Sequence, residues 1–334
     1  MAVSPEHWLK LTPAGLYCVP GGFHIDPMEA VPSAVITHGH ADHARAGHGA
    51  TLSTPDTAAI MALRYGKEHA SRIETAPYRR ATKIGDATVT LLPAGHILGS
   101  AQVMIEHGGT RVSVSGDFKR RRDPTCAPFE PSPCDLFITE ATFGLPVFRH
   151  PGDAHEIGRL LTSMALYPER AHLVGVYPLG KCQRVLCLLR EAGYDKPVYL
   201  HGALQALTDL YASLGVEVGA TAPLGDTKRD ALKGALVLCP PSALADRWSR
   251  RLPDPVVAVA SGWMSVKQRA RQAGVELPLV ISDHADWNEL RATITESGAG
   301  QVWVTHGRAD ALVYWCRQQG LAAEPLNIIG YDES

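Results

Sequence analysis

The sequence has no C-x-x-C pair, no apolar run long enough to cross a bilayer and no strong excess of charge of either sign. Its seven cysteines are odd in number and scattered, which is the pattern of reduced thiols and not of a disulfide framework. A net charge of -2 gives no overall electrostatic attraction to nucleic acid, which argues against an unspecific coating protein, so phosphate binding has to come from local clusters. The first residues carry no basic and then apolar signal. We therefore expect a cytoplasmic protein that is neither secreted nor embedded in a membrane.

The chain also lacks low-complexity segments and repeats of fixed period. Its 334 residues, 45% of them hydrophobic, can bury a full core and fit either two domains or one large domain with an insertion. Short strand-like runs alternate with helical patterns, which indicates the α/β class. Breaks rich in glycine and proline near 144–152 and 274–278 divide the chain into three parts.

The clearest local prediction is a β-hairpin. Its strands, 101–106 and 111–115, flank Gly108-Gly109, and two glycines readily take the positive φ of a tight turn. Periodicity further predicts helices over 154–167 and 183–191. Strands of a second, partly parallel sheet are predicted at 173–177, 198–200, 235–238 and 256–260, and later strands at 279–281 and 302–304.

The most informative segment is Thr37-His38-Gly39-His40-Ala41-Asp42-His43, which follows an apolar run, 34–36, predicted to be a buried strand. Imidazole and carboxylate suit divalent cations such as zinc. A turn at the end of a strand lets His38 and His40 face one ion, and Asp42 and His43 a second. A helix would point such close neighbours to different faces. The alternative is a histidine-rich surface loop without metal, which would need no aspartate at this spacing.

Two further polar residues follow apolar runs. His96 comes after the run 89–92, and the preceding Gly95 lets the backbone bend so that the imidazole points back over the sheet edge. Asp117 follows the run 112–115, and its two carboxylate oxygens are enough to bridge two cations about 3.5–4 Å apart. Taken singly, a structural histidine and a turn or helix-capping aspartate are the alternatives.

The order His-x-His-x-Asp-His, then Gly-His, then Gly-Asp resembles the metallo-β-lactamase fold. This resemblance implies a four-layer αβ/βα sandwich with its metals at one edge. Asp26, in His24-Ile25-Asp26-Pro27, is similar to the first motif of that fold, whose residue supports the metal cluster from behind.

Three later segments resemble motifs of the β-CASP nucleases: Ile138-Thr139-Glu140-Ala141-Thr142-Phe143-Gly144 motif A, Ser282-Asp283-His284-Ala285-Asp286 motif B, and Val304-Thr305-His306-Gly307 motif C. The resemblance covers nearly the whole chain. It implies a reduced β-CASP-like cap, 147–279, inserted between two parts of the metallo-β-lactamase domain, 1–146 and 280–334. The chain further resembles the bacterial DNA-ligase-associated exonucleases, which are encoded near a ligase and a helicase. This resemblance implies a DNA ligase and a helicase as functional partners.

Carried over residue by residue, the resemblance implies two divalent metal ions, zinc foremost and manganese as the alternative. His38, His40, His96 and Asp117 would hold one, and Asp42, His43, Asp117 and His306 the other. His284 would donate a proton to the leaving oxygen, while Glu140 would fix its tautomer and keep it charged. A ligand-like histidine without a proton role is the alternative for His284. The expected catalytic residues are Asp42, Glu140 and His284.

Substrate contacts are predicted at three places. Gly180 and Lys181 lie where a strand meets a helix, so the amides and the lysine suit a phosphate. Lys119 and Arg120 open a basic run just after Asp117, although such runs are as often solvated loops. Trp263 offers an indole on which a base could stack, with a core tryptophan as the alternative.

The leading hypothesis is a metal-dependent exonuclease with a 5′ end bias that acts on DNA during repair. DNA is favoured by resemblance to the ligase-associated group, whereas a histidine at motif C, here His306, favours RNA. An RNA-processing nuclease is therefore the second hypothesis. A catalytically dead scaffold is disfavoured by the intact ligand set, and a small-molecule hydrolase by the cap and motifs A to C.

Overall fold

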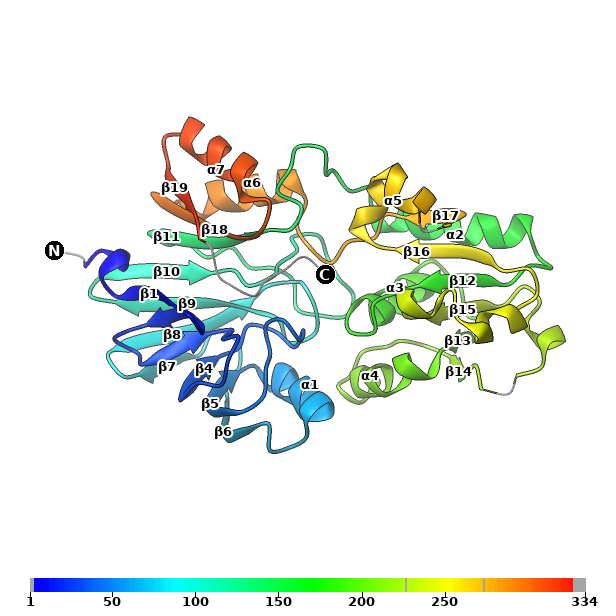
Figure 1. The fold of residues 1–334 in the computed structure, drawn as a ribbon, viewed down its shortest axis with the longest axis horizontal. Helices are drawn as coiled ribbons and strands as arrows, with labels where there is room; N and C mark the ends of the chain where they lie inside the picture. The colour runs from blue at the N-terminus through cyan, green and yellow to red at the C-terminus, as the bar shows by residue number, and fades with distance from the viewer. Residues whose placement is uncertain (1–2, 226, 273, 327–334) are drawn as a thin grey trace. The chain divides into compact units, whose positions relative to one another are not determined.

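The computed structural model describes residues 3–225, 227–272 and 274–326. These residues form two compact units (Figure 1). The first comprises the chain up to Arg149 together with the part from His284 onward, and the second is His150–Asp283. The predicted bounds of the cap, 147–279, lie a few residues before the bounds of this second unit.

The first unit contains two mixed sheets. The strands of one are Leu9–Thr12 (β1), Gly15–Cys18 (β2), Phe23–Ile25 (β3), Ser33–Val35 (β4), His48–Ser53 (β5) and Ala70–Thr75 (β6), in the order β1-β2-β3-β4-β5-β6. The strands of the other are Ala81–Ile84 (β7), Ala87–Pro93 (β8), Ala101–His107 (β9), Thr110–Val114 (β10), Leu136–Ala141 (β11), Gln301–Gly307 (β18) and Ala322–Pro325 (β19), in the order β19-β18-β11-β10-β9-β8-β7. A short 3₁₀ helix, Pro5–His7 (η1), precedes β1.

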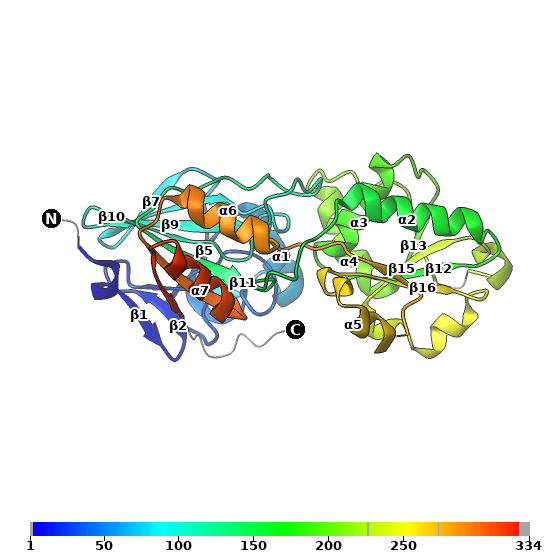
Figure 2. The same ribbon diagram turned by 90° about the horizontal axis from the view of Figure 1, so that it is seen from above.

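The two sheets pack face to face, and helices cover their outer faces (Figure 2). Between the sheets lies an apolar core to which Val35 contributes from the first and Val103 from the second. Helix α1 (Pro55–Tyr65) packs Met61 against the outside of the first sheet. Helices α6 (Trp287–Ser297) and α7 (Ala309–Gln318) pack Leu290, Leu312 and their neighbours against the second. The layers are helix, sheet, sheet and helix, so the predicted αβ/βα sandwich is confirmed.

The predicted hairpin is also confirmed. β9 and β10 pair antiparallel from His107 opposite Thr110, and Gly108 and Gly109 between them have φ values of 56° and 77°. Only glycine takes two successive positive φ angles at little cost, which is why this turn could be located from the sequence.

Strand direction explains where the polar residues gather. β8 and β10 both run antiparallel to β9, while β11 and β18 run parallel to β10. The carboxyl ends of β8, β10, β11 and β18 therefore meet at one edge of the second sheet. The loop after β4 reaches the same edge, because the Ala101 amide donates to the Thr37 carbonyl at 2.8 Å.

The second unit is an α/β layer structure of its own. Its strands are His172–Gly175 (β12), Val198–Leu200 (β13), Thr221–Pro223 (β14), Leu236–Cys239 (β15), Val256–Ala260 (β16) and Leu277–Leu279 (β17), all parallel, in the order β14-β13-β15-β12-β16-β17. Its helices are Asp153–Leu166 (α2), Lys181–Glu191 (α3), Gly202–Ser213 (α4) and Lys267–Gln272 (α5), with 3₁₀ turns at Arg229–Leu232 (η2), Pro241–Ala243 (η3), Arg247–Arg251 (η4) and Gly262–Ser265 (η5). Apolar residues of α2, α3 and α4 cover one face of the sheet, and α5 lies on the other (Figure 2).

One strand differs from its prediction. The strand expected at 279–281 lies at Leu277–Leu279, and it belongs to the fully parallel sheet of the second unit. The chain leaves the ladder after Leu279 because the Val280 amide donates to Oε2 of Glu156 at 2.7 Å. In addition, Nζ of Lys181 donates to the Ile281 carbonyl at 2.6 Å. Side chains distant in sequence thus take the hydrogen bonds that a longer strand would have used.

Within the described ranges, no helix is both long and apolar enough to cross a membrane. All seven cysteines are free, and all but the half-buried Cys126 are buried.

Candidate metal centre and active site

The loop after β4 carries the first group of donors. The side chains of His38 and His43 are buried, at 0% and 1% exposure, while His40 is partly exposed. The segment 39–43 turns at the end of the strand, as predicted, so histidines close in sequence approach one another instead of spreading around a helix. The ring centres of His38 and His43 are 4.1 Å apart.

Asp26, the residue expected from the first motif, holds this loop in place through hydrogen bonds. Its Oδ1 accepts a hydrogen bond from the Thr37 amide at 2.7 Å, and its Oδ2 lies 2.8 Å from Nδ1 of His43. The hydroxyl of Thr37 donates to Asp26 Oδ2 at 2.5 Å and lies 3.0 Å from Nδ1 of His38. Thr37 was not identified from the sequence, because a lone threonine beside a histidine carries no distinctive pattern. Its hydroxyl links the imidazole of His38 to the Asp26 carboxylate, which itself contacts His43.

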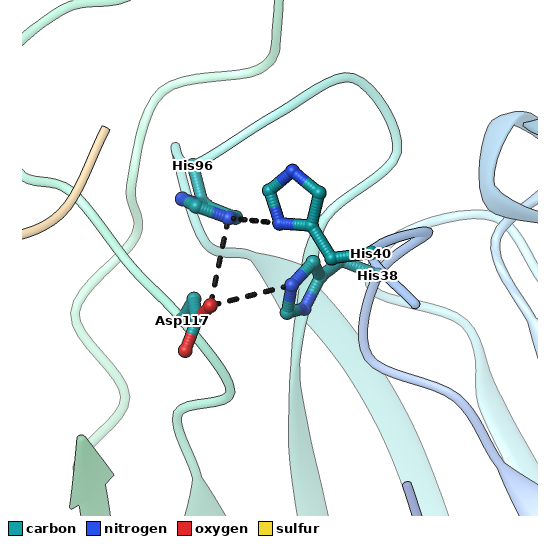
Figure 3. Close-up of side chains that lie close together, drawn as sticks. All are labelled: His38, His40, His96 and Asp117. Atoms are coloured by element: carbon teal, nitrogen blue, oxygen red, sulfur yellow. Dashed lines mark hydrogen bonds and ion pairs between the residues drawn. The ribbon is translucent and has the colours of Figure 1, made fainter. Parts of the chain in front are cut away.

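Asp117 is the centre of the arrangement. Its Oδ2 lies 3.4 Å from Nε2 of His38, 3.5 Å from Nε2 of His43 and 3.6 Å from Nε2 of His96. Nε2 of His96 lies 3.0 Å from Nδ1 of His40 (Figure 3). One carboxylate oxygen therefore faces both the His38, His40 and His96 group and the His43 group.

These spacings fit a bound cation. Four ligand atoms about 2.0–2.1 Å from one zinc in tetrahedral geometry stand roughly 3.3 Å from one another. The separations of 3.0, 3.4 and 3.6 Å within the group His38, His40, His96 and Asp117 scatter around that value. Nε2 of His38, although buried, has no hydrogen-bond partner within the described part of the chain. Three imidazoles and a carboxylate are also the donor set that zinc prefers.

The electrostatics of Asp117 and His96 suit ligation, whereas those of His43 favour its protonated form. Burial would raise the pKa of Asp117, but the surrounding imidazoles, with His43 foremost, hold it well below its usual range. Burial and, to a smaller extent, the nearby His284 lower the pKa of His96 well below its ordinary value. This imidazole is therefore neutral and keeps a lone pair. Burial acts against a charge on His43 as well, yet the carboxylates of Asp117 and Asp26 raise its pKa to about 10.

The second predicted ligand set is looser than the first. Oδ2 of Asp42 lies 3.8 Å from Nε2 of His43, and the Asp42 side chain is 46% exposed. The His306 ring is centred 5.0 Å from that of His43, and both line a small cavity together with Asp26 and Gly116. Neither Asp42 nor His306 belongs to the compact donor groups found among the described residues. Burial and, to a smaller extent, the nearby His43 lower the pKa of His306 to about 4.

Glu140 and His284 form a separate pair beside Asp117. Glu140 is fully buried on β11, and its Oε1 accepts from the Phe118 amide at 2.8 Å. Nδ1 of His284 lies 2.9 Å from Oε2 of Glu140, and the His284 ring is centred 4.7 Å from that of His96. The three residues Asp117, Glu140 and His284 each bring one ligand-type atom within 4.8 Å of the others. The structure thus brings together the residues expected from motifs A and B.

The basic run after Asp117 does not form the free positive surface that was considered. Lys119 is only 1% exposed. Arg120 pairs with Glu296 of α6 at 2.8 Å, and Arg121 pairs with Glu289 of the same helix at 3.1 Å. The charges of Arg120 and Arg121 are compensated by a helix about 170 residues away in sequence, and a role of Lys119 and Arg120 in substrate contact stays a prediction.

The predicted phosphate cradle in the second unit is likewise occupied by the chain itself. The Gly180 amide donates to Oε1 of Gln183 at 2.9 Å, which satisfies the start of α3. Lys181 is 3% exposed and its Nζ lies 2.9 Å from Oδ1 of Asp283. Gly180 and Lys181 are therefore structural in this conformation. Trp263 is half-buried, with the guanidinium carbon of Arg269 4.0 Å from its ring centre.

Comparison with known proteins gives relatives over different parts of the chain. A probable DNA ligase of Opitutus terrae is 32% identical over 314 residues, which are 92% of this chain and 30% of that protein. Cleavage and polyadenylation specificity factor subunit 3 of Dictyostelium discoideum is 33% identical over 134 residues, 39% of this chain and 17% of that one. Endoribonuclease YSH1 of Kluyveromyces lactis is 31% identical over 127 residues, 37% of this chain and 16% of that one. The chain thus spans less than a third of the length of these relatives.

No protein-family profile matches the sequence. A crystal structure of a protein of unknown function from Enterococcus faecalis V583 has a TM-score of 0.56 to this chain, at 13% identity over 81% of this chain and 74% of the other. That likeness concerns the fold alone. By sequence this chain is a homologue of the probable DNA ligase and a more distant relative of the β-CASP nucleases, and its αβ/βα sandwich and buried histidine and aspartate clusters agree with that similarity.

Proposed function

We propose that this chain is a two-metal nuclease that hydrolyses phosphodiester bonds as a DNA exonuclease with a 5′ end bias, acting in DNA repair. The observation that carries the proposal is the position of Asp117 Oδ2, which lies within 3.6 Å of imidazole nitrogens from both histidine groups. A carboxylate oxygen so placed suits two neighbouring cations. Asp117 would then contribute to holding both ions.

In this proposal His38, His40, His96 and Asp117 hold one metal ion, and Asp42, His43, Asp117 and His306 hold the other. When bound, two such ions lower the pKa of water and offset negative charge on a phosphate. Zinc fits the imidazole-rich set best, and manganese is the alternative. Asp26 and Thr37 orient His38 and His43, since each contacts an imidazole nitrogen on the side away from Asp117.

The proton chemistry belongs to His284. Glu140 accepts the hydrogen on Nδ1, which leaves Nε2 as the atom that carries the proton toward a leaving oxygen. Glu140 itself is held by the Phe118 amide, so the pair is rigid. Asp42, partly exposed beside His43, completes the proposed catalytic group. In the second unit, Trp263 remains a candidate for stacking on a base.

DNA is favoured because the relative aligned over 92% of this chain is described as a probable DNA ligase. On the same ground we propose that the protein works alongside a DNA ligase and, by resemblance to the ligase-associated group, a helicase. RNA processing is the second candidate, supported by relatives described as an endoribonuclease and a polyadenylation factor. Those relatives align over less than half of the chain, and the ligase relative over most of it.

Product analysis with labelled substrates tests this proposal. Metal-loaded protein is incubated with single- and double-stranded DNA and RNA labelled at either the 5′ or the 3′ end, beside an Asp117→Ala control. We expect immediate release of the 5′ label from DNA as short products and gradual shortening of the 3′-labelled strand. Internal cuts in RNA, with DNA left intact, would favour the second candidate. No cleavage of either nucleic acid would reject both.

A further inference from the structure

A second feature of the first unit lies on the outer helices, away from the clustered histidines. α6 and α7 lie side by side on the second sheet (Figures 1 and 2). The guanidinium carbon of Arg291, on α6, is 5.0 Å from the centre of the Trp315 ring and 5.9 Å from that of Trp287. Two indoles thus hold a long cationic side chain in one position.

Arg291 forms no ion pair within the described part of the chain. Its neighbours Arg120 and Arg121 each pair with a glutamate of α6, whereas Arg291 has no carboxylate partner among the described residues. Its Nε atom, although buried, makes no hydrogen bond within the same ranges. An arginine that is fixed but unpaired is suited to an external anion, because little side-chain freedom remains to be lost on binding.

Arg291 lies in a hollow with aromatic and polar walls. Asn288, Thr295 and the indole of Trp315 line a surface depression of about 390 Å³ around it, a size in the usual range for small ligands. Glu296 also lines the depression, but Arg120 neutralises it through contacts of 2.8 and 2.9 Å. The hollow is therefore positive, with an indole on one side and an amide and a hydroxyl on the other.

We propose that this depression holds one nucleotide of the nucleic-acid strand outside the metal centre, with the base on Trp315 and the phosphate on Arg291. The inference rests on the proposed nuclease function and adds a second contact with the same substrate. An indole stacks on any base, and a guanidinium meets a phosphate through two parallel hydrogen bonds. An acidic peptide would engage the cation but leave the indole face without a partner.

Chain length limits how far this contact lies from His284. Three extended residues lead from His284 to Trp287, and four helical residues lead on to Arg291, which together span at most about 17 Å. A duplex strand rises about 3.4 Å per nucleotide, so roughly five nucleotides cover that distance. A strand of twelve nucleotides is long enough to reach both places, whereas a small diester occupies only one.

Binding of a labelled 12-nucleotide DNA with cleavage-resistant phosphorothioate linkages tests the inference by fluorescence anisotropy over a range of salt concentrations. Arg291→Gln should weaken binding about tenfold and reduce the slope of log affinity against log salt by about 0.7, the value for one lost phosphate contact on a single strand. Trp315→Ala should weaken binding at least fivefold. Trp315→Phe, which preserves more packing, should weaken it less.

Arg72→Gln is the matched control, because Arg72 is exposed on β6 and pairs with Glu74 at 2.7 Å in another part of the same unit. It should leave both affinity and salt slope unchanged. Wild-type affinity and slope in both Arg291→Gln and Trp315→Ala would overturn the inference, as would an equal loss in Arg72→Gln.

Hydrolysis of bis(p-nitrophenyl) phosphate separates this inference from the nuclease proposal. Arg291→Gln should hydrolyse this small diester at the wild-type rate while binding the 12-nucleotide strand more weakly. If the wild-type protein hydrolyses no phosphodiester but the loss of strand binding is still found, the nuclease proposal fails and the nucleotide contact stands. If the diester rate falls in step with strand binding, Arg291 supports the metal centre and the contact is rejected.

Discussion

Nδ1 of His284 lies 2.9 Å from Oε2 of Glu140, and the other oxygen of the same carboxylate accepts the amide hydrogen of Phe118. Phe118 directly follows Asp117. One fully buried carboxylate therefore fixes both the imidazole of motif B and the loop that carries the central aspartate. A change at Glu140 reaches two parts of the centre, whereas a change at His284 reaches one.

The first prediction separates proton transfer from metal binding. His284→Ala should retain both metal equivalents and lose on the order of 10²–10⁴ in cleavage rate, because a positioned acid is removed. Glu140→Gln should give a smaller loss, since the amide still contacts the ring but no longer favours its charged form. Metal analysis and single-turnover cleavage of the two variants measure this. Loss of one metal equivalent in His284→Ala would make His284 a ligand instead.

The second prediction concerns stoichiometry. Protein purified without chelator should contain two metal ions per chain, predominantly zinc, because imidazoles dominate both proposed ligand sets. Chelator should abolish cleavage, and zinc or manganese should restore it. Elemental analysis decides the number. A content near zero or one, with no gain of activity on adding either metal, contradicts the two-metal assignment.

The third prediction concerns the central ligands. His40→Ala and Asp117→Ala should abolish cleavage while keeping the cooperative unfolding transition, because both side chains lie on loops at the sheet edge and not in the apolar core. Circular dichroism during thermal unfolding checks the fold, and single-turnover assays check the rate. A wild-type rate in either variant would remove the basis of the proposed mechanism.

Polar residues that directly follow strands could be predicted from the sequence. Parallel strands end at a common edge of a sheet, so a short motif after each strand is enough to predict that these residues meet. His38, His40, His96 and Asp117 are brought together in this way. Glu140 and His284 were found only through their resemblance to family motifs. Alone, each is a single polar residue with many alternative roles.

The basic residues show what the sequence could not reveal. Whether Arg120 contacts substrate or Glu296 depends on the packing of α6 beside it, more than 170 residues later. The role of Lys181 likewise depends on its pairing with Asp283, about a hundred residues away in sequence. Such pairings are tertiary, so local pattern gives the charge of a segment but not its partner.

The fourth prediction tests support of the metal centre from behind. Asp26→Asn should keep the contact with the Thr37 amide but present an NH₂ group to Nδ1 of His43, which reverses the tautomer and places a hydrogen on the nitrogen that faces Asp117. Metal affinity should fall about 10- to 100-fold. Chelator competition measures it. Asp135→Asn is the control, because Asp135 also accepts from a backbone amide, that of Arg111 at 2.7 Å, but contacts no histidine of the cluster. Equal losses in both variants would show a general effect on folding.

The last prediction concerns the buried charges of the second unit. Arg184 is fully buried, and its guanidinium contacts the carboxylates of Asp153, at the start of α2, and Asp283, where the chain leaves the unit. It also donates to the Ser282 carbonyl. Arg184→Met fills the same space but, in a poorly solvated place, leaves Asp153 without this cation and leaves Asp283 with Lys181 alone. Removing one partner of a buried pair typically costs 3–5 kcal/mol, on the order of the whole stability margin of a small domain.

Equilibrium unfolding in urea, followed by limited proteolysis of the second unit, measures the cost in Arg184→Met. Adding Asp153→Asn to that variant should recover part of it, because the carboxylate that has lost Arg184 is then neutral, whereas Asp283 still pairs with Lys181. Arg247→Met serves as the control for loss of an arginine elsewhere in the unit and should change the free energy of unfolding by less than about 0.5 kcal/mol. If Arg184→Met is as stable as the wild type, or if Asp153→Asn adds its full single-variant cost, then the arginine does not compensate these carboxylates. The path of residues 280–283 is then held by other contacts.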